Sequence, residues 1–258
     1  MSLTAPAPSA LDPQRRRRAD RARQVADVLR RQVLHGLVSD GALPSESDLA
    51  VDFGVSRNTV REALDLLRDE GLVDRVPGVG TRVTCGKYLH GLDHLRGLAE
   101  TLSGAGRVRN EVRVSGLVPA PGPVARRLDL QPGDPVVYLE RRRLADDVPL
   151  SLDLTYVVRD LGEHLLGEDL AGRDVFALLE SISGRSLGEA EVTLEAVVAD
   201  AHSAAILEVA PRSPLLMLER LTHLDDGRPV DLEFIRFRGD RITMRGTVRR
   251  ASPKEATA

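Results

Sequence analysis

The chain has 258 residues, of which 42% are hydrophobic and 29% are charged, which is typical of a soluble globular protein with one or two domains. No apolar run approaches the ~20 residues of a membrane helix, and the first residues lack the apolar core of a signal peptide, so we expect a cytoplasmic protein with no membrane partner. The net charge of -3 at pH 7 excludes a generally basic protein, so any DNA-binding surface must be local.

The first segment is rich in Pro, Ala and Ser and ends with four arginines, Arg15 to Arg18. We expect residues 1–18 to form a disordered basic tail, which is either simply solvated or an arm that contacts phosphates. Residues 1–84 hold 13 Arg and 12 Asp or Glu, a net charge of +1, whereas residues 85–258 carry a net charge of -4. This small excess means that the positions of the arginines must decide whether the segment binds DNA.

Two helices are predicted after the tail. Apolar residues at helical spacing predict a first helix from Asp20 through Leu37. Ser45 is expected to cap a second helix, with Asp48 three residues later as the acidic member of a capping pair, and Gly54 ends this helix.

A third helix and a hairpin follow. Ser56 begins the helix and Gly71 ends it, while residues 72–83 predict two short strands around a Pro-Gly-Val-Gly turn. The order helix, helix, tight turn, helix, hairpin predicts a winged helix-turn-helix over residues 19–84.

The third helix has the features of a recognition helix. Arg57 and Arg61 are four residues apart and share a face, from which arginine can bind guanine or clamp a phosphate. The alternative is a solvated helix face on which Arg61 pairs with Asp65. The candidate DNA-binding residues are polar residues at the start of this helix and the two glycines of the wing, where the backbone can approach DNA closely: Ser56, Arg57, Asn58, Thr59, Arg61, Gly78 and Gly80.

Residues 42–83, ALPSESDLAVDFGVSRNTVREALDLLRDEGLVDRVPGVGTRV, closely resemble the DNA-binding domain of the GntR family of bacterial regulators. The resemblance implies DNA contacts at Arg57, Thr59, Arg61 and Gly78. The family usually has Arg directly after the Glu of its LPSE motif, and this chain has Ser47 there.

The remainder predicts an α+β domain over residues 92–250, joined by a linker at 85–91 and followed by a tail at 251–258. Its expected strands, in chain order, are 108–118, 135–145, 148–158, 188–199, 214–224, 229–238 and 241–249. Its expected helices are 89–104, 122–128, 174–183 and 201–208. Turns of the Asp-Asp type predict antiparallel hairpins.

An internal repeat links two of these hairpins. The segment beginning at Leu128 and the segment beginning at Leu207 share a proline turn, a Leu-Glu-Arg strand, an Asp-Asp turn and a second strand. Arg141 matches Arg220 and, with one inserted residue, Asp153 matches Glu233. We expect the two hairpins to face each other or to lie side by side in one sheet; the alternative is a chance likeness of turns.

Strand alternation gathers polar side chains on one face of these hairpins. Arg141 shares a face with Arg143, and Asp153 shares one with two hydroxyls, while Asp231, Glu233 and Phe237 lie on one face of the last hairpin. Arginines suit a phosphate or carboxylate, and carboxylates suit hydroxyls or an amine. The alternative is that these charges form cross-strand pairs on a solvated face.

Residues 92–248 resemble the UTRA effector domain of the HutC subfamily through the run Arg141–Leu144, the segment Asp174–Phe176, and Asp226–Asp231 with Arg238–Arg241. The resemblance implies an antiparallel sheet with flanking helices, similar to chorismate lyase, and ligand contacts at Arg141, Arg143, Asp153, Asp231 and Phe237. The family often has Glu at both acidic positions and Tyr at the aromatic one, which suggests a different ligand here.

These observations predict a homodimeric repressor that leaves a palindromic double-stranded operator when a small phosphate, carboxylate or zwitterion binds the second domain. A dimeric DNA-binding protein without a ligand and a lyase-like enzyme are the alternatives, although no catalytic arrangement is evident. Cys85 is the only cysteine and the six histidines are scattered, so we expect neither a metal nor another cofactor.

Overall fold

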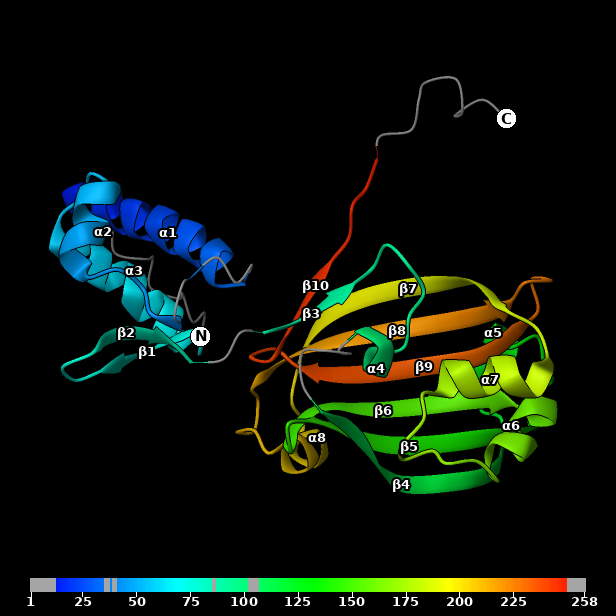
Figure 1. The fold of residues 1–258 in the computed structure, drawn as a ribbon. Coiled ribbons are helices and arrows are strands. Elements are labelled where there is room, and N and C mark those ends of the chain that lie inside the picture. The colour runs from blue at the N-terminus through cyan, green and yellow to red at the C-terminus, as the bar shows by residue number, and fades with distance from the viewer. Residues whose placement is uncertain (1–12, 35–37, 39–40, 85–86, 102–106, 250–258) are drawn as a thin grey trace, which may run out of the picture. The chain divides into compact units, whose positions relative to one another are not determined.

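The computed structural model describes residues 13–34, 38, 41–84, 87–101 and 107–249 (Figure 1). It divides into two compact units, Met1–Lys87 and Tyr88–Ala258. Among the described residues, no helix is both long enough and apolar enough to cross a membrane. Cys85 and the predicted tail at 251–258 lie outside the described residues.

The first unit contains the predicted three helices and hairpin. The helices are α1 (Pro13–Leu34), α2 (Glu46–Asp52) and α3 (Arg57–Asp69), and the antiparallel hairpin pairs β1 (Val73–Val76) with β2 (Gly80–Val83). Ser45 caps α2 by accepting a hydrogen bond from the Asp48 amide, as the sequence predicted. Buried leucine and valine side chains of α1, α2, α3 and β1 form one core.

The predicted disordered tail is wrong for its last residues, because α1 begins at Pro13 and includes all four arginines. Proline is tolerated in the first turn of a helix, where its missing N–H would have no partner, and arginine is a good helix former. Arg18 forms an ion pair with Glu62 of α3 at 2.7 Å, and because both side chains are nearly half exposed, the pair contributes little to stability. Residues 1–12 lie outside the description.

The second unit is built on a six-stranded antiparallel sheet, which confirms the predicted fold class. Its strand order is β4-β5-β6-β9-β8-β7 (Figure 1). The strands are β4 (Val108–Pro119), β5 (Pro135–Ala145), β6 (Val148–Val158), β7 (Leu187–Val198), β8 (Pro214–Leu224) and β9 (Pro229–Arg238).

The internal repeat is a structural repeat, and the two hairpins lie side by side through the pairing of β6 with β9. Strands β4, β5 and β6 correspond to β7, β8 and β9. The equivalence extends to the turns, since Asp129 and Glu208 both have positive φ, 54° and 53°. Arg141 pairs with Asp153 in the register of the first hairpin, and Arg220 pairs with Glu233 in that of the second.

Helices cover both faces of the sheet. α7 (Val175–Ser183) and α6 (Arg159–Leu165) cover the face that carries Arg141, together with the short α4 (Leu98–Thr101) (Figure 1). α5 (Gly122–Arg127) and α8 (Ala201–Leu207) belong to clusters with apolar residues of the opposite face, such as Leu232 and Leu152. The face that carries Arg141 is therefore buried in its centre, and polar side chains there are removed from water, whereas the opposite face stays partly exposed at residues such as Glu140 and Arg236.

The predicted helix at 89–104 is wrong. The chain forms a strand, β3 (Tyr88–Gly91), within the predicted linker 85–91, and only α4 is helical; the end of the predicted helix lies outside the described residues. β3 pairs in parallel with β10 (Ile242–Arg245), which is shorter than the predicted final strand. A partner so distant in sequence leaves no local pattern, whereas leucines at 92, 95 and 98 imitate helical spacing. Helix α6 was not predicted.

Candidate DNA-binding surface and buried charged site

The first turns of α3 present an exposed polar face. Arg57, Asn58 and Arg61 are exposed, while Val60 and Leu64 are buried against the other helices. Among the described residues Arg57 has no ion-pair partner, so its guanidinium group is available to a phosphate or a base edge.

Ser56 and Thr59 form the N-terminal cap of this helix. The Ser56 hydroxyl accepts a hydrogen bond from the Thr59 amide and lies 2.9 Å from the Thr59 hydroxyl. Thr59 is only 4% exposed. Its burial argues against the DNA contact predicted for its side chain, and assigns both hydroxyls to fixing the start of α3.

The predicted alternative pairing of Arg61 with Asp65 is not what the structure contains. Arg61 Nε donates to Glu46 Oε2 at 2.7 Å, whereas Asp65 pairs with Arg68. The Arg61–Glu46 pair joins α3 to the start of α2. Because Arg61 remains 55% exposed, the pair is weak, and a phosphate could replace the carboxylate.

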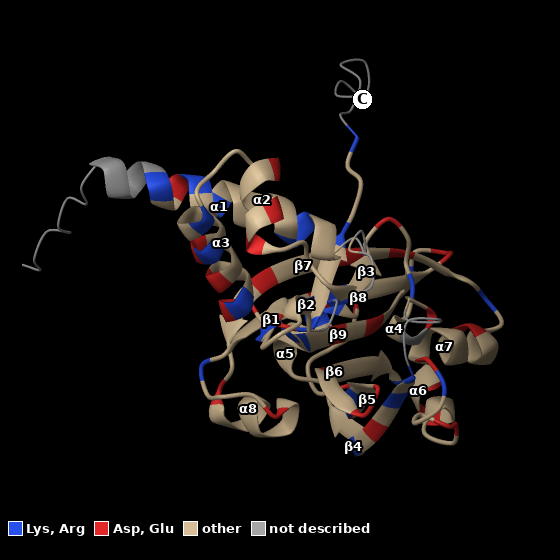
Figure 2. Cartoon of the chain, turned by 60° about the vertical axis from the view of Figure 1, so that its left-hand side comes forward, with Lys and Arg blue, Asp and Glu red and all other residues tan. Residues whose placement is uncertain are grey.

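The wing is exposed and depends on its glycines. Gly78 and Gly80 have φ angles of 77° and 109°, which favour glycine over residues with a side chain. Two exposed arginines on the wing strands, Arg75 and Arg82, were not predicted from the sequence. Basic and acidic residues are interspersed along α1 and α3 (Figure 2), in line with the small net charge of this unit.

In the second unit, the six predicted effector-site residues lie on one face of three adjacent strands, β5, β6 and β9: Arg141, Arg143, Asp153, Asp231, Glu233 and Phe237. Each is at most 2% exposed. The alternative of cross-strand pairs on a solvated face is therefore wrong. Burying several charges is unfavourable unless they are paired or serve a ligand, so the cluster is a candidate binding site.

In the first repeat, Asp153 is held by two neighbours. Arg143 Nε donates a short hydrogen bond to Asp153 Oδ2, and the Ser151 hydroxyl donates to Oδ1 at 2.6 Å. The other end of Arg143 lies 3.7 Å from Asp174, the N-cap residue of α7. Arg143 thus ties the sheet to the helix that covers it.

In the second repeat, Arg220 forms an ion pair with Glu233, the residue that corresponds to Asp153. Its Nε donates to Glu233 Oε2 at 2.8 Å, and its Nη1 lies 3.4 Å from the carbonyl oxygen of Arg96. The guanidinium group lies 4.3 Å from the ring centre of Phe176, a cation–π contact with α7.

Two ionisable side chains in the cluster, Arg141 and Asp231, have no hydrogen-bond partner among the described residues. This applies to all three guanidinium nitrogens of Arg141 and to both carboxyl oxygens of Asp231. Burial, and next the charge of Glu233, raise the pKa of Asp231 well above its ordinary value. Burial, followed by the nearby Arg143, lowers the pKa of Arg141. Both groups therefore gain most from a ligand that supplies an anion and a proton donor.

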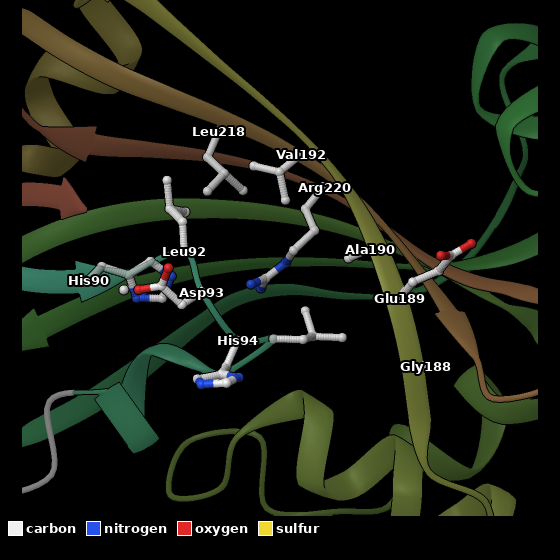
Figure 3. A pocket seen from close by; sticks show the side chains of 12 residues that line it. His90, Leu92, Asp93, His94, Gly188, Glu189, Ala190, Val192, Leu218 and Arg220 are labelled. Atoms are coloured by element: carbon white, nitrogen blue, oxygen red, sulfur yellow. The ribbon is translucent and has the colours of Figure 1, made fainter. Parts of the chain in front are cut away.

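An open pocket leads toward this cluster (Figure 3). The loop after β3 forms one side of the pocket and β7 forms the other, with Arg220 pointing between them toward His90 and Asp93. His90, Leu218 and Arg220 also line an enclosed space with room for about one water molecule, next to Arg143, Asp153 and Phe237. These three residues separate the open pocket from the cluster.

Three residues of this site were not predicted. Arg220 could have been found from the repeat, because it matches Arg141. Asp174 could have been identified as a helix cap, but the sequence alone does not show that it contacts Arg143. His90 gave no signal; it is buried on β3, and burial, followed by the charges of Arg220 and Arg143, lowers its pKa to about 4.

Two known families match this chain. "Bacterial regulatory proteins, gntR family" matches residues 21–83, and "UTRA domain" matches residues 104–243. The first match contains α2, α3 and the wing, and the second contains the six-stranded sheet with the buried charged cluster.

Full-length relatives share both parts. The chain is 29% identical over 222 residues to the HTH-type transcriptional repressor NagR of Bacillus subtilis, covering 85% of this chain and 91% of NagR. It is 29% identical over 181 residues to the histidine utilization repressor of Pseudomonas aeruginosa, covering 70% and 72%. The crystal structure of PhnF from Mycobacterium smegmatis superposes with a TM-score of 0.64 at 26% identity, covering 87% of this chain and 99% of PhnF.

Proposed function

Because this chain belongs to the GntR family of bacterial regulatory proteins and carries a UTRA domain, we propose that it is a homodimeric repressor that releases its operator when a small molecule binds the buried charged cluster. The chain is a transcription regulator rather than an enzyme, as are the relatives it matches.

For DNA binding, the proposal assigns the recognition surface to Arg57, Asn58 and Arg61, with Gly78 and Gly80 allowing the wing backbone to approach the duplex. Ser56 positions this surface by capping α3. One domain offers few contacts and a net charge of only +1, so we expect modest, salt-sensitive binding by a single copy. Two copies on half-sites about one helical turn apart would supply the affinity, which favours a palindromic operator.

For the effector, one observation carries the proposal: Arg141 and Asp231 are buried, and neither has a hydrogen-bond partner among the described residues. A ligand with an anionic group for Arg141 and a donor for Asp231 would satisfy both. Since His90 and Arg220 line both the open pocket and the enclosed space, the ligand is expected to enter past them. His90 lies on β3, the first element of the second unit, so its displacement offers a route to the DNA-binding unit.

The test begins with an operator selected from random DNA by the full chain. Fluorescence anisotropy then measures its affinity in the presence of individual small metabolites. We expect at least one compound to weaken binding in the wild type, and to have no effect on Arg141→Met or Asp231→Asn, although both variants bind the operator. A ligand that raises the melting temperature and leaves operator affinity unchanged would instead support the DNA-binding protein without ligand control.

A further inference from the structure

The buried cluster contains one acidic residue that originates outside the sheet, Asp174. Its Oδ1 accepts a hydrogen bond from the Phe176 amide at 3.1 Å, which caps the nine-residue helix α7. Its Oδ2 lies 3.7 Å from Arg143 Nη1. A helix N-terminus beside an arginine attracts anions. In this protein its own carboxylate occupies that position.

The surroundings of Asp174 indicate that this position belongs to the effector site. Arg141 is on the same face of β5 as Arg143, is fully buried, and has no hydrogen bond within the described part of the chain. The charge of Asp174 influences the pKa values of both Arg141 and Asp231. The backbone of Gly97 packs against the Asp174 carboxylate so closely that a Cβ there would clash with it. The Gly97 backbone therefore closes one side of the space that the carboxylate occupies.

The net charge of the buried cluster limits which ligands can bind in it. The three arginines, Arg141, Arg143 and Arg220, stay protonated, and they face four carboxyl groups, Asp153, Asp174, Asp231 and Glu233. With Asp231 protonated, the buried cluster is neutral. A phosphate ester would bring up to two further negative charges into it, whereas a molecule with one carboxylate and one ammonium group adds none. Uncompensated buried charge is strongly unfavourable.

We propose that Asp174 is a specificity-determining residue that excludes phosphate from the effector site and restricts it to zwitterions of the amino-acid type. The carboxylate of such a ligand would pair with Arg141, and its ammonium group would donate a hydrogen bond to the carbonyl oxygen of the protonated Asp231 carboxyl group. This inference rests on the proposed function in one respect, namely that the buried cluster is the effector site.

The test compares three full-length proteins: wild type, Asp174→Ser and Asp200→Ser. Serine is as good a cap as aspartate, so both substitutions should preserve their helices. Asp200 is the matched control, because it caps α8 through His202 and Ser203, outside the cluster. Should Asp174→Ser fail to fold, Asp174→Asn replaces it. Thermal unfolding is measured in potassium phosphate and in potassium chloride of equal ionic strength.

We expect phosphate to raise the melting temperature of Asp174→Ser by about 2 °C or more beyond its effect on the other two proteins. Phosphate that binds the DNA-binding unit affects all three equally. An equal response of the three proteins would overturn the role of Asp174.

A second arm screens the wild type with the common amino acids and with glucose 6-phosphate and glycerol 3-phosphate. A rise in melting temperature with an amino acid, and none with the phosphate esters, supports the inference. The reverse pattern, or no response to any amino acid, overturns the zwitterion class. Operator affinity is followed in parallel: a stabilising amino acid that does not release DNA would contradict the proposed function and leave the ligand class intact.

Discussion

Arg141 and Asp153 lie directly opposite each other on β5 and β6, but the carboxylate of Asp153 bonds to Arg143 and Ser151 instead. The closest ion-pair distance between Arg141 and Asp153 is 3.9 Å. In the second repeat the matching residues, Arg220 and Glu233, do form their hydrogen bonds. The asymmetry arises because the residue matching Arg143 in the second repeat is Thr222. Arg143 thus leaves Arg141 free for a ligand.

Replacing Arg141 with methionine should lower the free energy of unfolding less than replacing Arg143 does. Arg141 makes no hydrogen bond within the described residues, so its loss removes only its charge from the cluster. Arg143→Met should lower the free energy of unfolding by about 3–5 kcal/mol, because Asp153 loses its main partner. Urea unfolding measures both. Similar destabilisation by the two substitutions would show that Arg141 is satisfied in the unliganded protein.

Arg57→Ala should weaken operator binding by about 1–3 kcal/mol and leave the melting temperature unchanged, because the side chain is exposed on α3. Arg61→Ala should weaken binding by a similar amount. Arg23→Ala is the matched control, since this exposed arginine of α1 lies outside the predicted recognition surface. Gel-shift titration and thermal unfolding separate the two effects. Operator affinity equal to that of the wild type would contradict the assignment of α3 as the recognition helix.

The sequence predicted those features of the fold that are determined by local residue patterns. The strands 135–145 and 148–158 of the first hairpin were predicted with the bounds they have, since alternation and an Asp-Asp turn fix a strand pair locally. The same alternation placed Arg141, Arg143 and Asp153 on one face. It did not reveal that this face is buried, because burial depends on helices α6 and α7 from elsewhere in the chain. The pairing of β3 with β10, and with it the position of His90, likewise depends on a partner distant in sequence.

Asp231 should make the protein less stable as the pH rises. Its pKa is raised in the folded protein, chiefly by burial and then by Glu233, so the folded state binds more protons than the unfolded state above pH 3.8. Stability is therefore lost as the pH rises through the raised pKa. Asp231→Asn should remove this loss, and its advantage over the wild type should grow from pH 4 to pH 8 in urea unfolding.

Asp160 serves as a control for Asp231, because its pKa is lowered in the folded protein and not raised. Two hydrogen bonds from Arg228, at 2.7 and 2.8 Å, lower the pKa of Asp160. Its contribution is present above pH 3.8 and is lost as the pH falls through the lowered pKa. Asp160→Asn should therefore not gain stability relative to the wild type as the pH rises. An identical pH dependence of Asp231→Asn and wild type would mean that Asp231 is ionised normally when folded.

His90 should make the protein less stable in acid. Its pKa falls from 6.5 to about 4 on folding, chiefly because of burial and then because of Arg220 and Arg143, so the unfolded state binds the extra proton between these two values. The stability that depends on neutral His90 is complete above pH 6.5 and is lost as the pH falls toward 4. The loss amounts to at most about 3.5 kcal/mol, since the pKa falls from 6.5 to about 4 and each pKa unit corresponds to ~1.4 kcal/mol. His90→Gln should lack this dependence, whereas His164→Gln, which changes an exposed histidine of α6, should retain it. Urea unfolding between pH 4 and 7 distinguishes them, and parallel curves for wild type and His90→Gln would refute the burial of a neutral His90.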